Sequence, residues 1–345
     1  MPFNPNDIGQ PNGNYFALPC SLREATLALI SVPWDVTASF RPGTCRAPEA
    51  ILAASAQVDL FDADVPEAWN MKIGTVPQER QLTRNNKKYR ALAEKVITAL
   101  SRGAAPETVT GTLEKVNAAC EAMNDYVYRE TQAQLAANRI PAIIGGEHSV
   151  PLGALRALSG RYAGFGILHI DAHADLREAY EGFTCSHASI MHNALRLNSV
   201  KRLVQVAVRD YCNDEAECMQ RDKRITVFSD ALLHEAAFKG KTWAAQTAEI
   251  IRPLPQQVYI SFDIDGLSPD HCPNTGTPVP GGLSYARAVY LLRQLALSGR
   301  RIIGFDLCET APDANDASTA CRLLFQLCCC AHLASRKMKQ TIKKL

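Results

Sequence analysis

The chain lacks the signs of a membrane protein and of a nucleic-acid-binding protein. It has no run of about 18 apolar residues, the length that a helix needs to cross a bilayer. Its 37 Lys and Arg residues nearly balance 35 Asp and Glu residues, and no basic stripe is interleaved with aromatic residues. The N-terminal segment is polar and lacks the basic start and apolar stretch of a signal peptide. We therefore expect a cytoplasmic protein without membrane or nucleic-acid partners.

Two further patterns are missing. No pair of the 12 cysteines has the C-x₂-C spacing of a zinc site, and most of the cysteines lie inside apolar segments. We interpret them as buried, reduced thiols, which agrees with a cytoplasmic protein. No G-x-G-x-x-G segment follows a strand-like run, so the sequence does not favour a dinucleotide-dependent oxidoreductase.

Apolar, β-rich runs alternate with longer segments of helical spacing. The strand-like runs are residues 27–32, 140–144, 166–170, 203–208, 225–228, 258–262 and 302–307. The helical segments are residues 47–58, 88–100, 113–135, 188–197, 232–250, 285–297 and 318–339. Apolar strands separated by helices are typical of a parallel sheet covered on both faces. We therefore predict an α/β fold, a three-layer α-β-α sandwich with a mainly parallel central sheet. It should form a single domain over residues 1–345, with residues 1–24 as an N-terminal extension.

Segments rich in acids and histidines follow three of the strand-like runs. They are Gly145-Gly146-Glu147-His148-Ser149, Asp171-Ala172-His173-Ala174-Asp175 and Asp263-Ile264-Asp265-Gly266. Ligands bind outside the carboxyl ends of strands in an open parallel sheet, so these segments should meet at one edge. Alternate residues of an extended chain point the same way, which predicts that Asp171, His173 and Asp175 face one centre and that Asp263 and Asp265 do the same.

The three segments together predict a metal site. Buried carboxylates need a compensating charge, because an unpaired buried ion costs several kcal/mol. A single Asp-x-Asp is more often a capped loop, and a lone histidine is more often a core residue, but here they occur together without Lys or Arg. Carboxylate and imidazole ligands suit a hard-to-borderline divalent ion such as Mn²⁺. Six ligands are too many for one catalytic zinc and fit two ions that share carboxylates. The candidate ligands are His148, Asp171, His173, Asp175, Asp263 and Asp265.

In this order, the three motifs resemble those of the arginase (ureohydrolase) family, which includes arginase, agmatinase, guanidinobutyrase and formimidoylglutamase. The resemblance continues in residues 32–51, 274–278 and 305–312. It implies an arginase-like fold and an enzyme that hydrolyses a carbon–nitrogen bond of a small guanidino or amidino substrate. It also implies two Mn²⁺ per subunit and a homo-oligomer, either a trimer or a hexamer.

The resemblance assigns a role to each candidate residue. One Mn²⁺ would be bound by His148, Asp171, Asp175 and Asp263, and the other by Asp171, His173, Asp263 and Asp265, so that Asp171 and Asp263 bridge the ions. Glu309 matches the acid that pairs with the substrate guanidinium, for which a carboxylate is suited because both groups can pair bidentately. His187 matches the histidine proposed to pass protons to the leaving amine; its alternative is a loop or helix-start histidine.

Arg177 bears on the substrate class. It follows Asp175 by two residues, so we expect it to point toward the same opening. A fixed positive charge there would bind a carboxylate-bearing substrate, as in formimidoylglutamase-like chains, and would repel the free amine of agmatine. The alternative is that Arg177 pairs with Glu178, Glu181 or another acid.

We predict an agmatinase-like enzyme of polyamine metabolism, which converts agmatine to putrescine and urea. Formimidoylglutamase, guanidinobutyrase and arginase activities remain alternatives within the same chemistry. A catalytically silent oligomeric or regulatory family member is an alternative of another class. The presence of all six candidate ligands together with Glu309 argues against that last reading.

Overall fold

The computed structural model of the chain describes residues 3–342, with side chains for residues 3–336. Within this part of the chain, one eight-stranded sheet has the order β2-β1-β3-β8-β7-β4-β5-β6, and neighbouring strands are parallel. The strands are β1 (Leu27–Val32), β2 (Ile73–Val76), β3 (Ile140–Gly145), β4 (Phe165–Ile170), β5 (Val200–Val206), β6 (Ile225–Phe228), β7 (Gln257–Asp263) and β8 (Arg301–Cys308).

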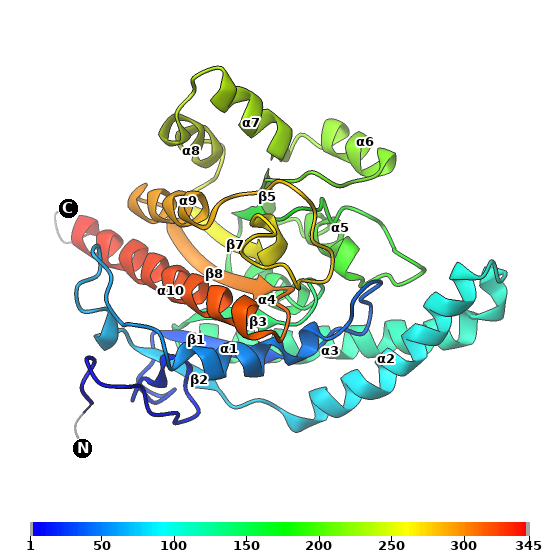
Figure 1. Cartoon of the computed structure of the whole chain (residues 1–345), viewed down its shortest axis with the longest axis horizontal. Coiled ribbons are helices and arrows are strands. Elements are labelled where there is room, and N and C mark those ends of the chain that lie inside the picture. Colours follow the sequence, from blue (N-terminus) through cyan, green and yellow to red (C-terminus); the bar gives the residue numbers. More distant parts are fainter. Residues whose placement is uncertain (1–2, 343–345) are drawn as a thin grey trace.

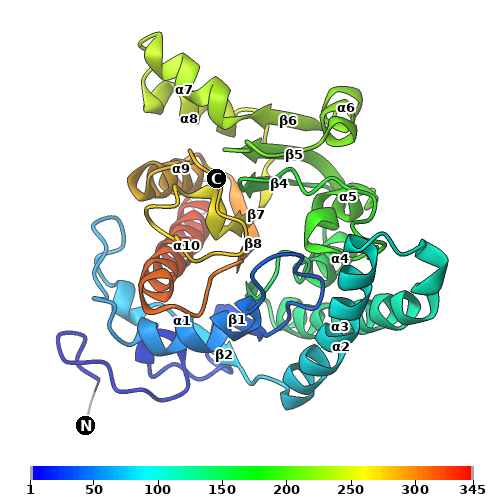
Figure 2. The same ribbon diagram turned by 45° about the vertical axis from the view of Figure 1, so that its right-hand side comes forward.

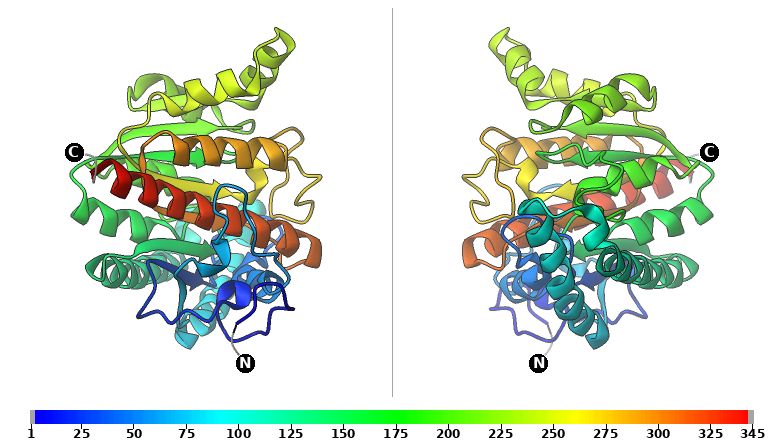
Figure 3. Two further views of the ribbon diagram at one scale, coloured as in Figure 1. Left: turned by 90° about the vertical axis from the view of Figure 1, so that its left-hand side faces the viewer. Right: turned by 90° about the vertical axis from the view of Figure 1, so that its right-hand side faces the viewer.

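Helices cover both faces of this sheet (Figures 1 and 2). On one face lie α1 (Ala47–Ser55), α8 (Trp243–Ile251), α9 (Tyr285–Leu297) and α10 (Ala314–Ile342). On the other lie α2 (Arg80–Ser101), α3 (Thr110–Ala136), α4 (Leu152–Arg161) and α5 (Ile190–Leu195). The edge near β6 carries α6 (Asn213–Arg221) and α7 (Asp230–Phe238). The side views of Figure 3 show α9 and α10 in front of the sheet on one side and the α2–α5 layer on the other.

The strands are buried on both sides because alternate residues enter different hydrophobic clusters. Leu29 of β1 belongs to the hydrophobic cluster that includes α1 and α10, whereas its neighbours Ala28 and Ile30 belong to the cluster that includes α3 and α4. Such two-sided burial explains why the strands are mostly apolar rather than alternating between apolar and polar residues. The predicted three-layer α/β fold is confirmed.

Several predicted element boundaries are wrong. Residues 232–250 were expected to form one helix but form α7 and α8, because the chain turns at Gly240, where φ is +84°. The short strand β2 and the helices α4 and α6 were not predicted. The helix predicted over residues 188–197 is reduced to α5 and follows a 3₁₀ turn, His187–Ser189.

Helix α10 belongs to the core. Its Ala314–Arg336 portion has the length and apolar composition of a membrane span, but 67% of the most apolar window is buried inside the protein. It packs against α1, α9 and β8. The adjacent cysteines 328–330 are buried in this helix, and all 12 cysteines are free thiols.

Candidate metal centre and substrate cavity

Four neighbouring strands deliver the candidate residues to one edge of the sheet. In the order β3-β8-β7-β4, these strands end next to His148, Glu309, Asp263 and Asp171, respectively. All four strands are parallel, so their carboxyl ends lie on the same side. Segments far apart in the sequence therefore meet in one place, as the motif positions predict.

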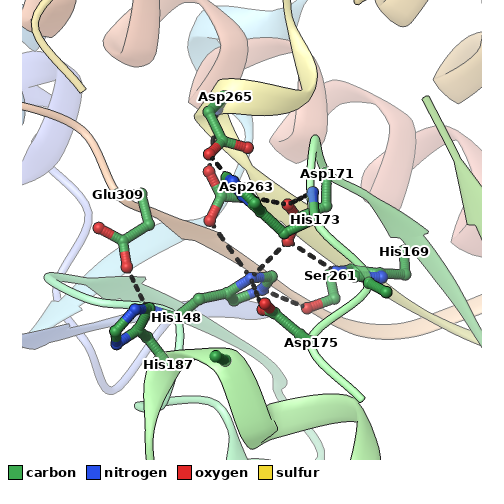
Figure 4. A network of polar contacts seen from close by, with 12 residues as sticks. His148, His169, Asp171, His173, Asp175, His187, Ser261, Asp263, Asp265 and Glu309 are labelled. Atoms are coloured by element: carbon green, nitrogen blue, oxygen red, sulfur yellow. Dashed lines mark hydrogen bonds and ion pairs between the residues drawn. The ribbon is translucent and has the colours of Figure 1, made fainter. Parts of the chain in front are cut away.

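His148 is surrounded by three carboxylates (Figure 4). Its Nδ1 atom lies 3.0 Å from Asp171 Oδ2, 3.2 Å from Asp175 Oδ2 and 3.3 Å from Asp263 Oδ2. All four residues are buried. We call His148, Asp171, Asp175 and Asp263 the His148 group.

A second set of donor atoms adjoins the first. His173 Nδ1 lies 3.1 Å from Asp265 Oδ2 and 3.4 Å from Asp171 Oδ1. We call His173, Asp171 and Asp265 the His173 group. Asp171 gives one oxygen to each group, so the six candidate ligands form one continuous cluster. The His173 side chain is 25% exposed, which makes this group the more open of the two.

The donor atoms fit bound metal ions. Burial and the neighbouring charge of Asp171 raise the pKa of Asp175 to about 6. Burial and the charges of Asp265 and Asp171 raise the pKa of Asp263 well above its usual range. Carboxyl groups this crowded retain protons unless a cation lies between them. Divalent ions would satisfy the same oxygen and nitrogen atoms, and this mixed donor set suits ions such as Mn²⁺.

Residues that the sequence analysis missed hold the candidate ligands from behind. His169 Nε2 lies 2.8 Å from Asp171 Oδ2, and its other ring nitrogen lies 3.0 Å from Gln205 Nε2. Ser261 Oγ lies 2.9 Å from His148 Nε2 and donates to Asp306 Oδ2 at 2.8 Å. Such partners fix the orientation and tautomer of ligand side chains. The sequence does contain a signal for them, because His169 and Ser261 each precede a candidate ligand by two residues on the same strand face.

The ligands converge, but not through the extended backbone that we expected. Asp175 has a left-handed conformation with φ of +54°. Asp263 and Asp265 are separated by the start of a 3₁₀ turn, Ile264–Gly266, in which Asp265 N donates to Asp263 Oδ1 at 2.9 Å. Tight turns at the strand ends, rather than alternation along a strand, aim these side chains at the cluster.

Glu309 is held in a strained conformation next to the His148 group. Its φ is +61°, a region that costs free energy for a residue other than glycine. Glu309 N donates to Gly146 O at 2.7 Å, and Glu309 Oε1 accepts a hydrogen bond from His148 N at 2.8 Å. Gly146 is required there, because a Cβ atom would lie 2.2 Å from Trp34 O. These contacts fix the carboxylate beside the candidate metal centre.

His187 lies at the wall of the same cavity. Its Nδ1 atom is 3.4 Å from Thr37 Oγ1, and its Nε2 atom is 3.4 Å from Ser39 Oγ. The ring of Tyr180 meets it edge-on, with centroids 6.1 Å apart. Glu147 accepts a hydrogen bond from Thr37 N at 2.8 Å and so anchors this loop to the first motif. Burial lowers the pKa of His187 to about 4, so the imidazole is neutral near pH 7.

A cavity of about 190 Å³ opens above the cluster. The candidate ligands His148, His173, Asp175, Asp263 and Asp265 line it together with His187 and Glu309. Part of the remaining lining comes from the segments that follow β4 and β5, namely Arg177, Tyr180, Asp210, Tyr211 and Glu215. The sequence analysis predicted only Arg177 among these five, because no motif spacing marks the others.

Arg177 is engaged by a local acid. Its Nε atom lies 3.8 Å from Glu215 Oε2, and its guanidinium carbon lies 4.9 Å from the centre of the Tyr180 ring. Glu215 also accepts hydrogen bonds from Leu176 N at 3.0 Å and Cys212 N at 2.9 Å. The pairing partner is thus neither Glu178 nor Glu181, the two acids named from the sequence, but the buried acid at the start of α6.

A comparison with protein families decides the identity of the fold. The model of the Arginase family matches residues 25–332. The chain belongs to the arginase family. It is accordingly a hydrolase of the ureohydrolase type, which acts on carbon–nitrogen bonds.

Among arginase-family relatives, the N(1)-aminopropylagmatine ureohydrolase of Thermus thermophilus is 31% identical over 304 residues, which cover 88% of this chain and 89% of the relative. The guanidinobutyrase of Pseudomonas aeruginosa is 26% identical and covers 90% of this chain and 88% of the relative. The crystal structure of agmatine ureohydrolase of Thermoplasma volcanium superposes with a TM-score of 0.71. At 22% identity, and covering 94% of this chain and 97% of that chain, it supports the fold.

Proposed function

We propose that this arginase-family enzyme hydrolyses agmatine, a guanidino compound with a cationic tail, to putrescine and urea, and that it uses two Mn²⁺ ions. The His148 group would hold one ion, and the His173 group together with Asp263 would hold the other, so that Asp171 and Asp263 would bind both ions. When bound, such ions supply a strong nucleophile from water at neutral pH and stabilise developing negative charge. The free thiols support a cytoplasmic location.

Glu309 would orient the substrate. Its Oε1 atom is engaged by His148 N, so the second oxygen is available to a guanidinium at the cavity floor. A carboxylate and a guanidinium are planar and complementary, so their pairing fixes direction as well as charge. The strained backbone of Glu309 supports this role, because strain of this kind is retained where geometry matters for function.

His187 would transfer a proton to the leaving amine. A neutral imidazole at neutral pH can accept a proton at Nε2, the nitrogen that faces Ser39 on the cavity wall, and pass it to the leaving amine. Thr37 on the other side of the ring keeps it in place.

The charges of the cavity residues Arg177, Glu215 and Asp210 support the choice of substrate. Arg177 and Glu215 offset each other, whereas the Asp210 carboxylate lines the cavity and has no hydrogen-bond or ion-pair partner within residues 3–336. One uncompensated negative charge therefore remains where the substrate tail would lie. This favours an amine-bearing tail over a carboxylate-bearing one.

A second candidate is N(1)-aminopropylagmatine. Its support is the 31% identity to the Thermus thermophilus enzyme with that name. The same cavity charge suits it, because its tail carries additional amines. Tyr211, which lies beside Asp210 on the cavity lining and is 43% exposed, offers an aromatic face for a longer cationic tail.

A substrate panel tests the proposal. Mn²⁺-loaded protein is assayed for urea and ammonia with agmatine, N(1)-aminopropylagmatine, arginine, 4-guanidinobutyrate and formimidoylglutamate. We expect the highest kcat/KM with one of the two cationic-tail substrates. Asp210→Asn should lower that value by about tenfold or more, the effect of a lost charged contact, and should spare 4-guanidinobutyrate. Acidic substrates that outperform agmatine would overturn the substrate assignment.

A further inference from the structure

Arg209 lies where two segments of the candidate metal centre meet. It follows β5, and within the described residues its side chain donates hydrogen bonds to backbone carbonyl oxygens at 2.7–3.2 Å. The acceptors belong to Ala207, Asp265, Leu267 and Val279. A guanidinium presents five donors in a rigid fork, and here that fork joins the end of β5 to the loop that follows β7.

The backbone of Arg209 is hydrogen-bonded to the segment that carries Asp171 and His173. The amide nitrogens of Arg209 and Asp210 donate to Ala172 O at 2.8 and 3.0 Å. Ala172 lies between Asp171 and His173, and its own nitrogen donates to Asp265 Oδ1 at 3.0 Å. His173 and Asp265, whose donor atoms are 3.1 Å apart, thus belong to two segments that are both anchored to Arg209.

The loop after β7 closes directly over the guanidinium. Gly282 has φ of +94°, and a Cβ atom there would lie 2.9 Å from Arg209 Nη2 and 2.7 Å from Leu267 O. Asp230 Oδ1 accepts a hydrogen bond from Gly282 N at 3.0 Å and holds the loop in this position. A lysine at position 209 would keep the charge, but its single ammonium could not reach carbonyl groups on both sides of the fork.

The His148 group has a separate support. His148 is held from behind by Ser261 and, through it, by Asp306 of β8. Within residues 3–336, the side-chain hydrogen bonds of Arg209 go to Ala207, Asp265, Leu267 and Val279 rather than to Ser261 or Asp306. The two groups of donor atoms therefore share Asp171 but depend on different residues for the placement of their histidines.

We propose that Arg209 is a positioning residue that sets the affinity of the His173 group for its metal ion. The metal affinity of the His148 group does not depend on it. The inference rests on the proposed two-ion site. Loss of residues that orient metal ligands typically weakens metal affinity by about 10–100-fold. Because the His173 group is the more exposed one, its ion is also the one that we expect to dissociate first.

A metal titration of Arg209→Lys tests this. Metal-free protein is titrated with Mn²⁺, free Mn²⁺ is followed by electron paramagnetic resonance, and bound metal is checked by elemental analysis. We expect the weaker of two binding steps to lose about tenfold or more in affinity and the tighter step to stay unchanged. Saturating Mn²⁺ should restore most of kcat, which a merely destabilised fold would not show.

Arg300→Lys is the matched control. Arg300 also donates to backbone carbonyl oxygens, at 2.9 Å to Leu254 and 3.4 Å to Arg252. It lies directly before β8, at the amino end of that strand, whereas the candidate metal centre lies at the carboxyl ends. Its replacement should leave both binding steps unchanged. Arg209→Lys protein that binds both ions like wild type, or loses both equally, would overturn the inference. Wild-type protein that binds fewer than two ions would instead refute the proposed two-ion site.

Hydrogen exchange in the wild-type protein gives a second test that needs no variant. The amides of Leu267, Ser268 and Leu283 form backbone hydrogen bonds within the loop that Arg209 holds. We expect their protection to rise between one and two equivalents of Mn²⁺, because the second ion fixes Asp265. Equal protection at one and two equivalents would contradict the coupling of this loop to the His173 group.

Discussion

Arg177→Ala tests whether Arg177 binds a carboxylate on the substrate tail or only pairs with Glu215. In the structure Arg177 Nε lies 3.8 Å from Glu215 Oε2. At an effective dielectric constant of about 20, two unit charges at that distance attract by about 4 kcal/mol. The Arg177 side chain is 36% exposed, so solvent screening and side-chain entropy reduce the net contribution to about 1 kcal/mol.

The substitution should therefore act mainly on stability. Glu215 would still accept hydrogen bonds from Leu176 N and Cys212 N, so its carboxylate would not be left without partners. We expect the free energy of unfolding to fall by about 1 kcal/mol. The kcat/KM values for agmatine and for 4-guanidinobutyrate should change together, by less than about threefold, because the charge that is removed was already offset.

The assay compares both substrates in wild type, Arg177→Ala and the Glu215→Gln control. If Arg177 instead binds a substrate carboxylate, its removal deletes a charged hydrogen bond worth about 1.5–3 kcal/mol. The kcat/KM for 4-guanidinobutyrate would then fall by about 10–100-fold while that for agmatine rises. That opposite response would refute the reasoning from the Arg177–Glu215 pair.

Four further substitutions test the roles within the site. Asp263→Asn should lose both metal ions and His148→Asn mainly one, because Asp263 is proposed to bridge them; equal metal content by elemental analysis would contradict the bridge. His187→Ala should keep both ions and slow kcat by about 10²–10⁴-fold, the usual effect of an acid–base group, and a wild-type rate would remove it from the mechanism. Glu309→Gln should also keep the ions and lower kcat/KM by about 10–100-fold, as judged by urea release, through the loss of a charged contact to the guanidinium.

The fold was predictable because its strands are buried on both faces. Runs such as residues 27–32 and 225–228 are mostly apolar and coincide with β1 and β6. The short edge strand β2 escaped notice because its four residues include Gly74 and pair with β1 alone. The break between α7 and α8 depends on the left-handed backbone at Gly240, and its helical flanks hide it in a periodicity argument.

The candidate ligands were predictable, whereas the tail end of the cavity was not. His148, Asp171 and Asp263 each mark the end of an apolar strand, where the chemistry of the residue conflicts with burial. Asp210 and Glu215 lie beyond β5, in segments that reach the cavity only through tertiary packing. Nothing in the local sequence indicates that Glu215 would cap α6 and engage Arg177 at once.

Urea release from agmatine as a function of bound Mn²⁺ tests the central claim most directly. Protein freed of metal by chelation, and verified by elemental analysis, should produce no urea. Activity should return as Mn²⁺ is restored and should become maximal at two ions per chain, since both groups of donor atoms are proposed to hold an ion. Full activity in verified metal-free protein, or no urea from any guanidino substrate at two bound ions, would contradict the account.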